Sequence, residues 1–137
     1  MKNRQLFFLL NQARHASMKF VDQNCLELFG ASGVQIGALF YLKENPNSLM
    51  KTMAKKLLLD DSAVTGLVKR LEKADMVFRQ KCPEDGRAFR LNLTTKGEKT
   101  ILSVIPFLRD FNQSIENQFS SEELDVIERY LTTMRKL

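Results

Sequence analysis

Apolar residues recur at steps of three and four along most of this chain, which is the period of an amphipathic α-helix. The pattern predicts a long first helix from about Arg4 to Phe29, with Gly30 as its C-cap. A second helix is predicted to begin after the N-cap Ser32 and to end at Asn45-Pro46-Asn47. Because this second helix is apolar nearly all round, we expect it to be buried.

Two short helices are predicted next, with only two or three residues between them. The first runs from Leu49 to about Leu58 with Ser48 as its N-cap, and the second begins after Asp60 or Asp61. An aspartate suits this place, since it accepts hydrogen bonds from free N–H groups at the positive end of the helix. The inward stripe of the second helix comprises Val64, Leu67, Val68 and Leu71. The close spacing is typical of a helix-turn-helix, whose second helix presents its polar face to the DNA major groove.

The pattern changes from helix to strand after Asp75. Met76 to Cys82 and Ala88 to Thr94 have strand composition, and Pro83 to Arg87 between them has the composition of a turn. The predicted hairpin carries four basic residues, Arg79, Lys81, Arg87 and Arg90. The order helix, helix, basic hairpin predicts a winged helix.

Two helices are predicted to complete the chain. Thr94 or Thr95 is expected to cap a long helix, with a kink or break near Ile105 because Pro106 removes a backbone donor. Ser120 and Glu123 have the spacing of a capping box at the start of the last helix. Its apolar face comprises Leu124, Ile127, Leu131 and Met134.

The formal charge of +5 is confined to one part of the 137 residues. The stretch from Leu49 to Lys99 holds 12 Lys and Arg against 7 Asp and Glu, and the remainder is balanced. A surplus within one compact module is the electrostatic footprint of a protein that binds a polyanion. The single histidine and the two separated cysteines, Cys25 and Cys82, argue against a metal site, a disulfide framework and histidine-based catalysis. No cofactor is expected. The sequence contains no set of residues typical of a catalytic site, so an enzyme is not expected either.

Membrane insertion and export are not expected either. The apolar run from Leu6 to Leu10 is too short for a signal peptide, and no stretch approaches the roughly 20 apolar residues of a membrane span. The expected location is the cytoplasm.

This order of elements resembles the MarR family of bacterial transcription regulators over almost the whole chain. The resemblance is carried by Leu49–Leu57, by Ser62–Ala74, by Asp85-Gly86-Arg87, which looks like the D-x-R of the family's wing, and by Leu93-Thr94-Thr95-Lys96-Gly97, which looks like its L-T-x-x-G. Two departures are Asp75, where the family usually has glycine, and Gly66, where a larger and often basic residue is common.

The resemblance implies a mainly α (α+β) fold in one domain, residues 1–137. Residues 1–30 and 98–137 would form intertwined dimerisation helices, 31–47 a buried connecting helix and 48–97 the winged helix-turn-helix. A homodimer would then hold two recognition helices over a pseudo-palindromic site in double-stranded DNA, about 34–36 Å apart. Arg87 would enter the minor groove, held by an ion pair with Asp85.

The combined pattern and resemblance predict a set of DNA-contacting residues: Lys51, Thr52, Ser62, Ala63, Thr65, Gly66, Lys69, Arg70, Arg79, Lys81, Asp85 and Arg87. Lys69 and Arg70 fit contacts to phosphates as well as to bases, and Ala63 offers only a methyl contact, for example to thymine.

Three alternatives stay open. The winged helix could serve as a protein–protein interaction module without specific DNA binding. A small aromatic or anionic effector, as the resemblance implies for many members, would release DNA from a cleft for which Phe8, Phe20, Phe40 and Phe111 are candidates. Cys82 lies beside Lys81 and near Arg79, a setting that favours a thiolate and a redox role at the wing.

Overall fold

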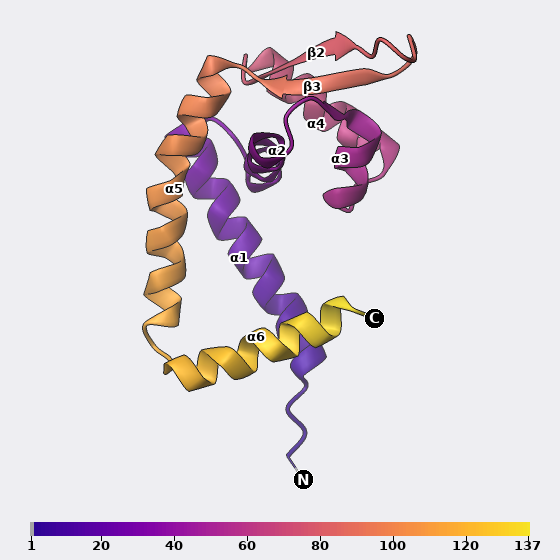
Figure 1. Ribbon diagram of the computed structural model, residues 1–137. Helices are drawn as coiled ribbons and strands as arrows, with labels where there is room; N and C mark the ends of the chain where they lie inside the picture. The colour runs from indigo at the N-terminus through magenta and orange to yellow at the C-terminus, as the bar shows by residue number, and fades with distance from the viewer. Residues whose placement is uncertain (1) are drawn as a thin grey trace. The chain divides into compact units, whose positions relative to one another are not determined.

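The structure is a computed structural model that describes residues 2–137, with six helices and a three-stranded sheet among them (Figure 1). Two compact units divide the chain, one ending at Ser103 and the other spanning Val104–Leu137. The mainly helical winged-helix fold predicted from the sequence is confirmed. Within the described residues no single helix is long and apolar enough to cross a membrane, although the first two helices, bent by 74°, pass that test as a pair.

The first two helices begin and end at residues that satisfy their free backbone groups. Helix α1 spans Leu6–Phe29, and Gly30 ends it in the left-handed conformation at φ 70°. Helix α2 spans Gly33–Glu44, and Ser32 forms a capping box with Gln35. The Gly33 N–H also donates to Asp22 Oδ1 at 2.6 Å, which fixes the start of α2 against α1. Both predicted caps are confirmed.

Helix α2 forms the centre of the first unit. It contacts α1 on one side and the winged helix on the other (Figure 1). Ile36, Leu39 and Leu42 are at most 3% exposed, as the sequence predicted for this helix.

One strand was not predicted. Ser48–Leu49 form β1, which pairs antiparallel with a later strand through Ser48 opposite Leu91 and Leu49 opposite Arg90. Helix α3 therefore spans only Met50–Lys56, and Leu49 rather than Ser48 is its N-cap residue. The prediction of Ser48 as a cap was wrong, because its hydroxyl donates to the Asn45 carbonyl instead.

Helix α4, Asp61–Lys73, agrees closely with the prediction. Asp60 caps it by accepting the Ala63 N–H at 2.8 Å. All four residues of the predicted stripe are buried: Val64, Leu67, Val68 and Leu71. The packing of α4 against α2, α3 and the sheet therefore leaves only its polar face in solvent.

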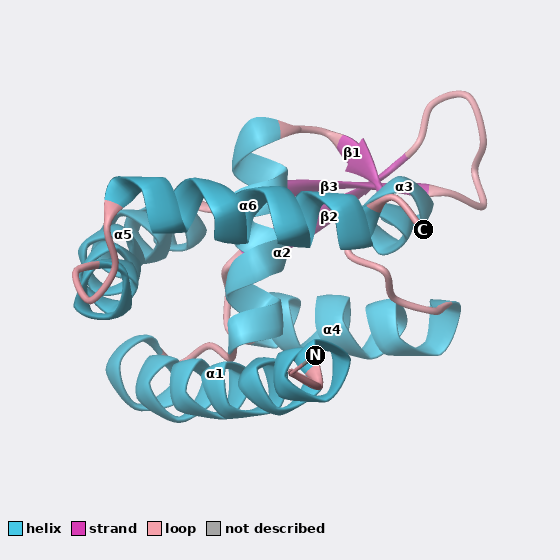
Figure 2. Cartoon of the chain, turned by 90° about the horizontal axis from the view of Figure 1, so that it is seen from below, coloured by secondary structure: helices cyan, strands magenta, loops and turns pink. Residues whose placement is uncertain are grey.

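The basic hairpin forms as predicted. Strand β2, Val77–Lys81, pairs antiparallel with β3, Phe89–Leu93, so the sheet has the order β1-β3-β2 (Figure 2). The loop between β2 and β3 is the wing.

Three turns of the winged helix contain non-glycine residues in the left-handed conformation. Asn47 precedes β1 with φ 60°, Leu58 lies between α3 and α4 with φ 57°, and Asp75 follows α4 with φ 59°. This conformation at Asp75 explains why glycine is common there in the resembling family.

Two helices end the chain. Helix α5, Thr95–Glu116, is capped by Thr94, whose Oγ1 accepts the Gly97 N–H at 3.0 Å. Of the kink or break predicted near Ile105, a break does not occur, since α5 runs on through Pro106, and a kink there stays a prediction. Proline there leaves the Leu102 carbonyl without its helical partner, but both residues are exposed, so water can satisfy that carbonyl. Helix α6, Ser121–Arg135, begins with the predicted capping box of Ser120 and Glu123.

Candidate nucleic-acid interface

The solvent face of α4 is polar, and its side chains are ordered by the helix itself. Ser62 Oγ donates to Asp60 Oδ1 at 2.9 Å, and Thr65 Oγ1 donates to the Asp61 carbonyl at 2.8 Å. The Ala63 N–H and the Ser62 hydroxyl together lower the pKa of the Asp60 carboxyl. Both hydroxyl protons are therefore used, and the exposed hydroxyl oxygens keep the capacity to accept hydrogen bonds from a ligand.

A small residue on this face accommodates a long one. A Cβ built on Gly66 would lie 3.3 Å from Arg70 Nη1, so the Arg70 guanidinium lies over the glycine one turn earlier. Lys69 and Arg70 are both exposed. The departure from the family pattern at Gly66 thus leaves room for the Arg70 side chain over this part of the helix.

Helices α3 and α4 and the wing form one groove of about 650 Å³. Of the predicted DNA-contacting residues, it brings together Lys51 from α3, Thr65 from α4, and Asp85 and Arg87 from the wing. Thr52, Ser62, Ala63, Lys69, Arg70 and Lys81 are exposed nearby in the sequence, but they do not line this groove. Its apolar lining includes Leu49, Met50, Val64 and Phe89, none of which was predicted from the sequence to be part of the interface.

Arg87 is not held as predicted. Asp85 Oδ1 accepts the backbone N–H of Arg87 at 3.0 Å, and no ion pair joins the two side chains in the described part of the chain. The predicted ion pair was therefore wrong. An aspartate that bonds a backbone N–H two residues on shapes the loop, and it leaves the exposed Arg87 guanidinium free to reach a ligand.

Arg79 is engaged inside the protein. Its Nε lies 3.1 Å from both carboxylate oxygens of Glu72, and its Nη2 also bonds Glu72 Oε1. Its guanidinium carbon lies 5.0 Å from the centre of the Phe89 ring. Hydrogen bonding to Glu72 raises the pKa of Arg79 further above its ordinary value. Arg79 was predicted to contact DNA, but its geometry is that of an internal contact.

Arg90 fixes the opposite strand of the hairpin. Its Nη1 donates to the Asn47 carbonyl at 3.0 Å and its Nη2 to Glu84 Oε2 at 3.1 Å. The Cys82 thiol donates to the same Glu84 oxygen at 3.1 Å. The hydrogen bond from the Cys82 thiol and, to a smaller extent, that from Arg90 lower the pKa of the Glu84 carboxyl.

Neither cysteine is in a reactive setting. Cys82 is buried and its thiol donates a hydrogen bond to Glu84 Oε2, so it is not the exposed thiol that the redox hypothesis requires. Cys25 is buried too, and burial raises the pKa of its thiol. Both thiols are free, and the residues described contain no group of three or more His, Cys, Asp or Glu side chains that could hold a metal ion.

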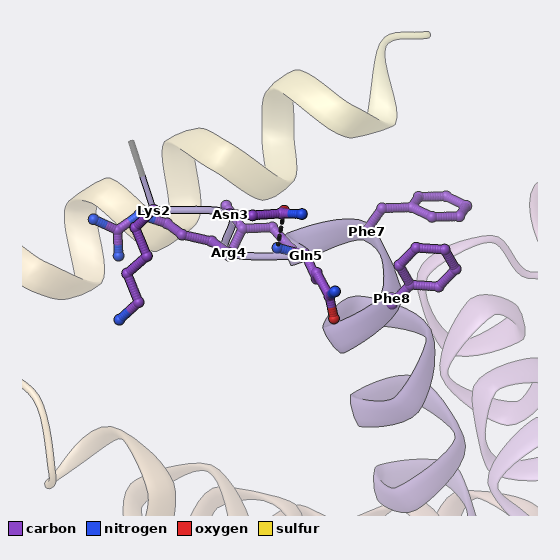
Figure 3. A pocket seen from close by; sticks show the side chains of 7 residues that line it. Lys2, Asn3, Arg4, Gln5, Phe7 and Phe8 are labelled. Carbon is purple, nitrogen blue, oxygen red and sulfur yellow. Dashed lines mark hydrogen bonds between the residues drawn. The ribbon is translucent and has the colours of Figure 1, made fainter.

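One of the predicted effector residues, Phe8, lines a pocket, and the effector site stays a prediction. Phe8 lies beside Phe7 in an edge-to-face pair with ring centres 5.7 Å apart, at a shallow pocket formed by residues 2–8 (Figure 3). A smaller hollow of about 240 Å³ lies between the end of α1 and the start of α5, lined by Leu28, Phe29, Lys96, Lys99, Thr100 and Ser103.

Comparison with known sequences agrees with the geometry. A sequence profile of the MarR family matches residues 29–88. The HTH-type transcriptional regulator YsmB of Bacillus subtilis is 27% identical over 120 residues, which cover 88% of this chain and 82% of YsmB. The regulator SarZ of Staphylococcus epidermidis is 29% identical over 119 residues, covering 86% of this chain and 76% of SarZ.

Comparison with solved structures gives the same fold. MepR of S. aureus, solved as a DNA complex, is 25% identical with a TM-score of 0.88, and the match covers 98% of both chains. PcaV of Streptomyces coelicolor, solved with its natural ligand, has the same fold at 18% identity and a TM-score of 0.85, covering 99% of this chain and 98% of PcaV. The profile match over residues 29–88, the relatives and the winged helix together support the MarR family of winged-helix transcription regulators for this chain.

Proposed function

We propose that this DNA-binding transcription regulator is a homodimeric repressor of a pseudo-palindromic operator. It acts in the cytoplasm, and a small aromatic or anionic effector releases it from DNA. Family membership supports DNA binding and transcription regulation. The dimer, the repressor role and the effector are the parts that experiment must test.

The observation that carries the proposal is the groove between α4 and the wing. It is lined by cationic Lys51 of α3 and Arg87 of the wing, together with the polar Thr65 of the recognition helix. In a DNA duplex, two phosphate backbones flank the base edges of the major groove. Two cationic side chains and a polar helix face suit such a surface. MepR, whose DNA complex has been solved, shares the fold over nearly the whole chain.

The dimer is supported by apolar faces that the single chain leaves in solvent. On α6, which buries no residue, Ile127 is 41% and Leu131 44% exposed. On α1, Leu6, Leu9 and Phe20 are exposed as well. A second chain would remove these faces from water and supply the two recognition helices that an inverted repeat requires.

The effector is supported by chemistry at the hollow between α1 and α5. Lys96 and Lys99 offer positive charge beside the apolar Leu28 and Phe29, which suits a small aromatic anion. Benzoate is a suitable probe. We expect it to release bound DNA from the wild type, and we expect the K96A/K99A variant to bind DNA equally well but to lose this response.

The first test is fluorescence anisotropy with the intergenic DNA beside the protein's own gene and a scrambled competitor, at about 150 mM salt. We expect binding about a thousandfold tighter than to the competitor, with two chains per site. Weak and equal binding to every duplex would contradict the proposal and favour a protein-interaction module.

Arg87→Ala tests the wing in the same assay. We expect a loss of about 1–3 kcal/mol in binding free energy because the exposed guanidinium has no partner within the wing. Arg14→Ala, which removes the same charge from an exposed position on α1, is the control and should change affinity little. Equal affinities of wild type and Arg87→Ala would exclude the wing from the interface.

A further inference from the structure

Three side chains from three elements meet where the recognition helix joins the hairpin. Glu72 lies in the last turn of α4, Arg79 in the middle of β2 and Phe89 at the start of β3. The Arg79 guanidinium bonds the Glu72 carboxylate through two nitrogens and stacks near the Phe89 ring. We refer to these three residues as the clamp.

The chemistry of the clamp suits a device that fixes geometry. The side chains of Arg79 and Glu72 are only 28% and 31% exposed, so water competes less than at an open surface. A planar guanidinium that binds both oxygens of a carboxylate fixes angle as well as distance, and its aromatic contact adds a third constraint. Lysine has neither property, because its ammonium is a single point charge.

The clamp lies between the two parts of the candidate DNA interface. Phe89 also lines the groove and follows Arg87 by two residues, whereas Glu72 belongs to the helix that carries Thr65 and Lys69. A shift of Phe89 relative to Glu72 would therefore move Arg87 relative to the solvent face of α4.

We propose that Arg79 is a positioning residue that holds the wing at a fixed distance from the recognition helix, so that both engage one duplex at once. The inference rests on the proposed function. It gives Arg79 a role opposite to the DNA contact that its basic strand predicts. The competing hypothesis is that Arg79 neutralises a phosphate. A lysine at position 79 could still neutralise a phosphate, but it could not make the planar contacts of the clamp.

Arg79→Lys separates the two hypotheses because it keeps the charge and loses the planar contacts. We expect an approximately tenfold loss of affinity for the specific duplex, and faster amide hydrogen exchange of Gln80 to Phe89 in the free protein. Lys81→Ala is the control on the same strand: it should leave exchange unchanged. Wild-type affinity and wild-type exchange in Arg79→Lys would overturn the proposal.

The double variant Arg79→Lys, Arg87→Ala provides the readout that a merely structural role would not move. If the clamp positions Arg87, the Arg87→Ala change should cost clearly less affinity in the Arg79→Lys background than in the wild type. Additive losses would overturn the proposal, since independent phosphate contacts add. Failure of the proposed function is distinguishable: no duplex would then be preferred by the wild type, while hydrogen exchange would still report whether the clamp holds the hairpin.

A charge swap covers the case in which one variant is poorly folded. Arg79→Glu should weaken DNA binding and speed exchange, and adding Glu72→Arg should restore part of both, because the paired charges are exchanged. If Arg79→Glu and the swapped protein lose affinity equally while exchange recovers, the charge at position 79 contacts DNA and the proposal fails.

Discussion

Helices α4 and α6 are built on the same plan and end in opposite surroundings. Each is amphipathic, and each starts at a side chain that accepts an N–H three residues on, Asp60 for α4 and Ser120 for α6. Helix α4 buries its whole apolar stripe within its own chain, whereas α6 buries none of its residues. A helical period therefore predicts that a face needs cover, but not whether the cover comes from the same chain or from another.

The largest expected effect comes from removing a side chain from the buried apolar stripe of α4. Leu67→Ala empties a site on α4 that is 1% exposed, so the free energy of unfolding should fall by about 2–5 kcal/mol. Urea unfolding followed by circular dichroism measures it. Leu131→Ala on α6 is the matched control and should cost much less. A loss below about 1 kcal/mol for Leu67→Ala would mean that the stripe of α4 is not tightly packed.

The second prediction concerns the exposed apolar face of α6. Leu131→Asp puts a charge on the apolar face of α6, and we expect the proposed dimer to dissociate while the winged helix stays folded. Loss of the second DNA-binding site should weaken operator binding by about 100-fold or more. Analytical ultracentrifugation gives the mass, with Arg129→Asp on another face of α6 as the control. A Leu131→Asp protein that remains dimeric would remove α6 from the interface.

A glycine in the first turn of α5 tests how tightly this helix packs against the residues that precede the hairpin. A Cβ on Gly97 would overlap the Met76 carbonyl oxygen, so the backbone must move in Gly97→Ala. We expect a loss of about 1–3 kcal/mol in the free energy of unfolding. Gly37→Ala in α2, where nothing lies within 4 Å of the new Cβ, should instead stabilise by about 0.5–1 kcal/mol. Similar effects for both substitutions would contradict this packing.

The smallest expected effect is a dependence on pH of the stability of α4, because its cap Asp60 is titratable and the cap of α6, Ser120, is not. The pKa of Asp60 is lowered from its ordinary value of 3.8 by bonds from Ala63 and Ser62, so the charged cap stabilises α4 above that value. This contribution is lost as the pH falls through the lower pKa of the folded state. Thermal unfolding between pH 6 and pH 2.5 should show a smaller acid destabilisation in Asp60→Asn than in the wild type. Identical pH profiles would show that the cap contributes nothing.

Local features of this fold were predictable from sequence, and contacts across the chain were not. The caps Gly30, Ser32, Asp60 and Ser120 depend on residues within one turn of each helix end, and all four are confirmed. Strand β1 exists only because its two residues find the free edge of β3 more than 40 positions later. No local period signals such a pairing.

The candidate site divides in the same way. The exposed face of α4 follows from its buried stripe, so the polar residues there could be found by period alone. By composition, Arg79 and Arg90 on the strands could not be distinguished from Arg87 in the loop. Arg79 and Arg90 are held by Glu72 and Glu84, which depends on strand register and loop shape, whereas Arg87 is left exposed at the wing.

The left-handed residues at the three turns have a consequence for how such a protein changes over generations. Leu58 is 91% exposed and occupies a conformation that costs a non-glycine residue about 1–2 kcal/mol, and Asn47 and Asp75 share that conformation at lower cost. A single change to glycine at Leu58 recovers part of this energy without touching the recognition helix. The fold thus holds stability in reserve, which can offset destabilising substitutions on α4 while a lineage acquires a new operator.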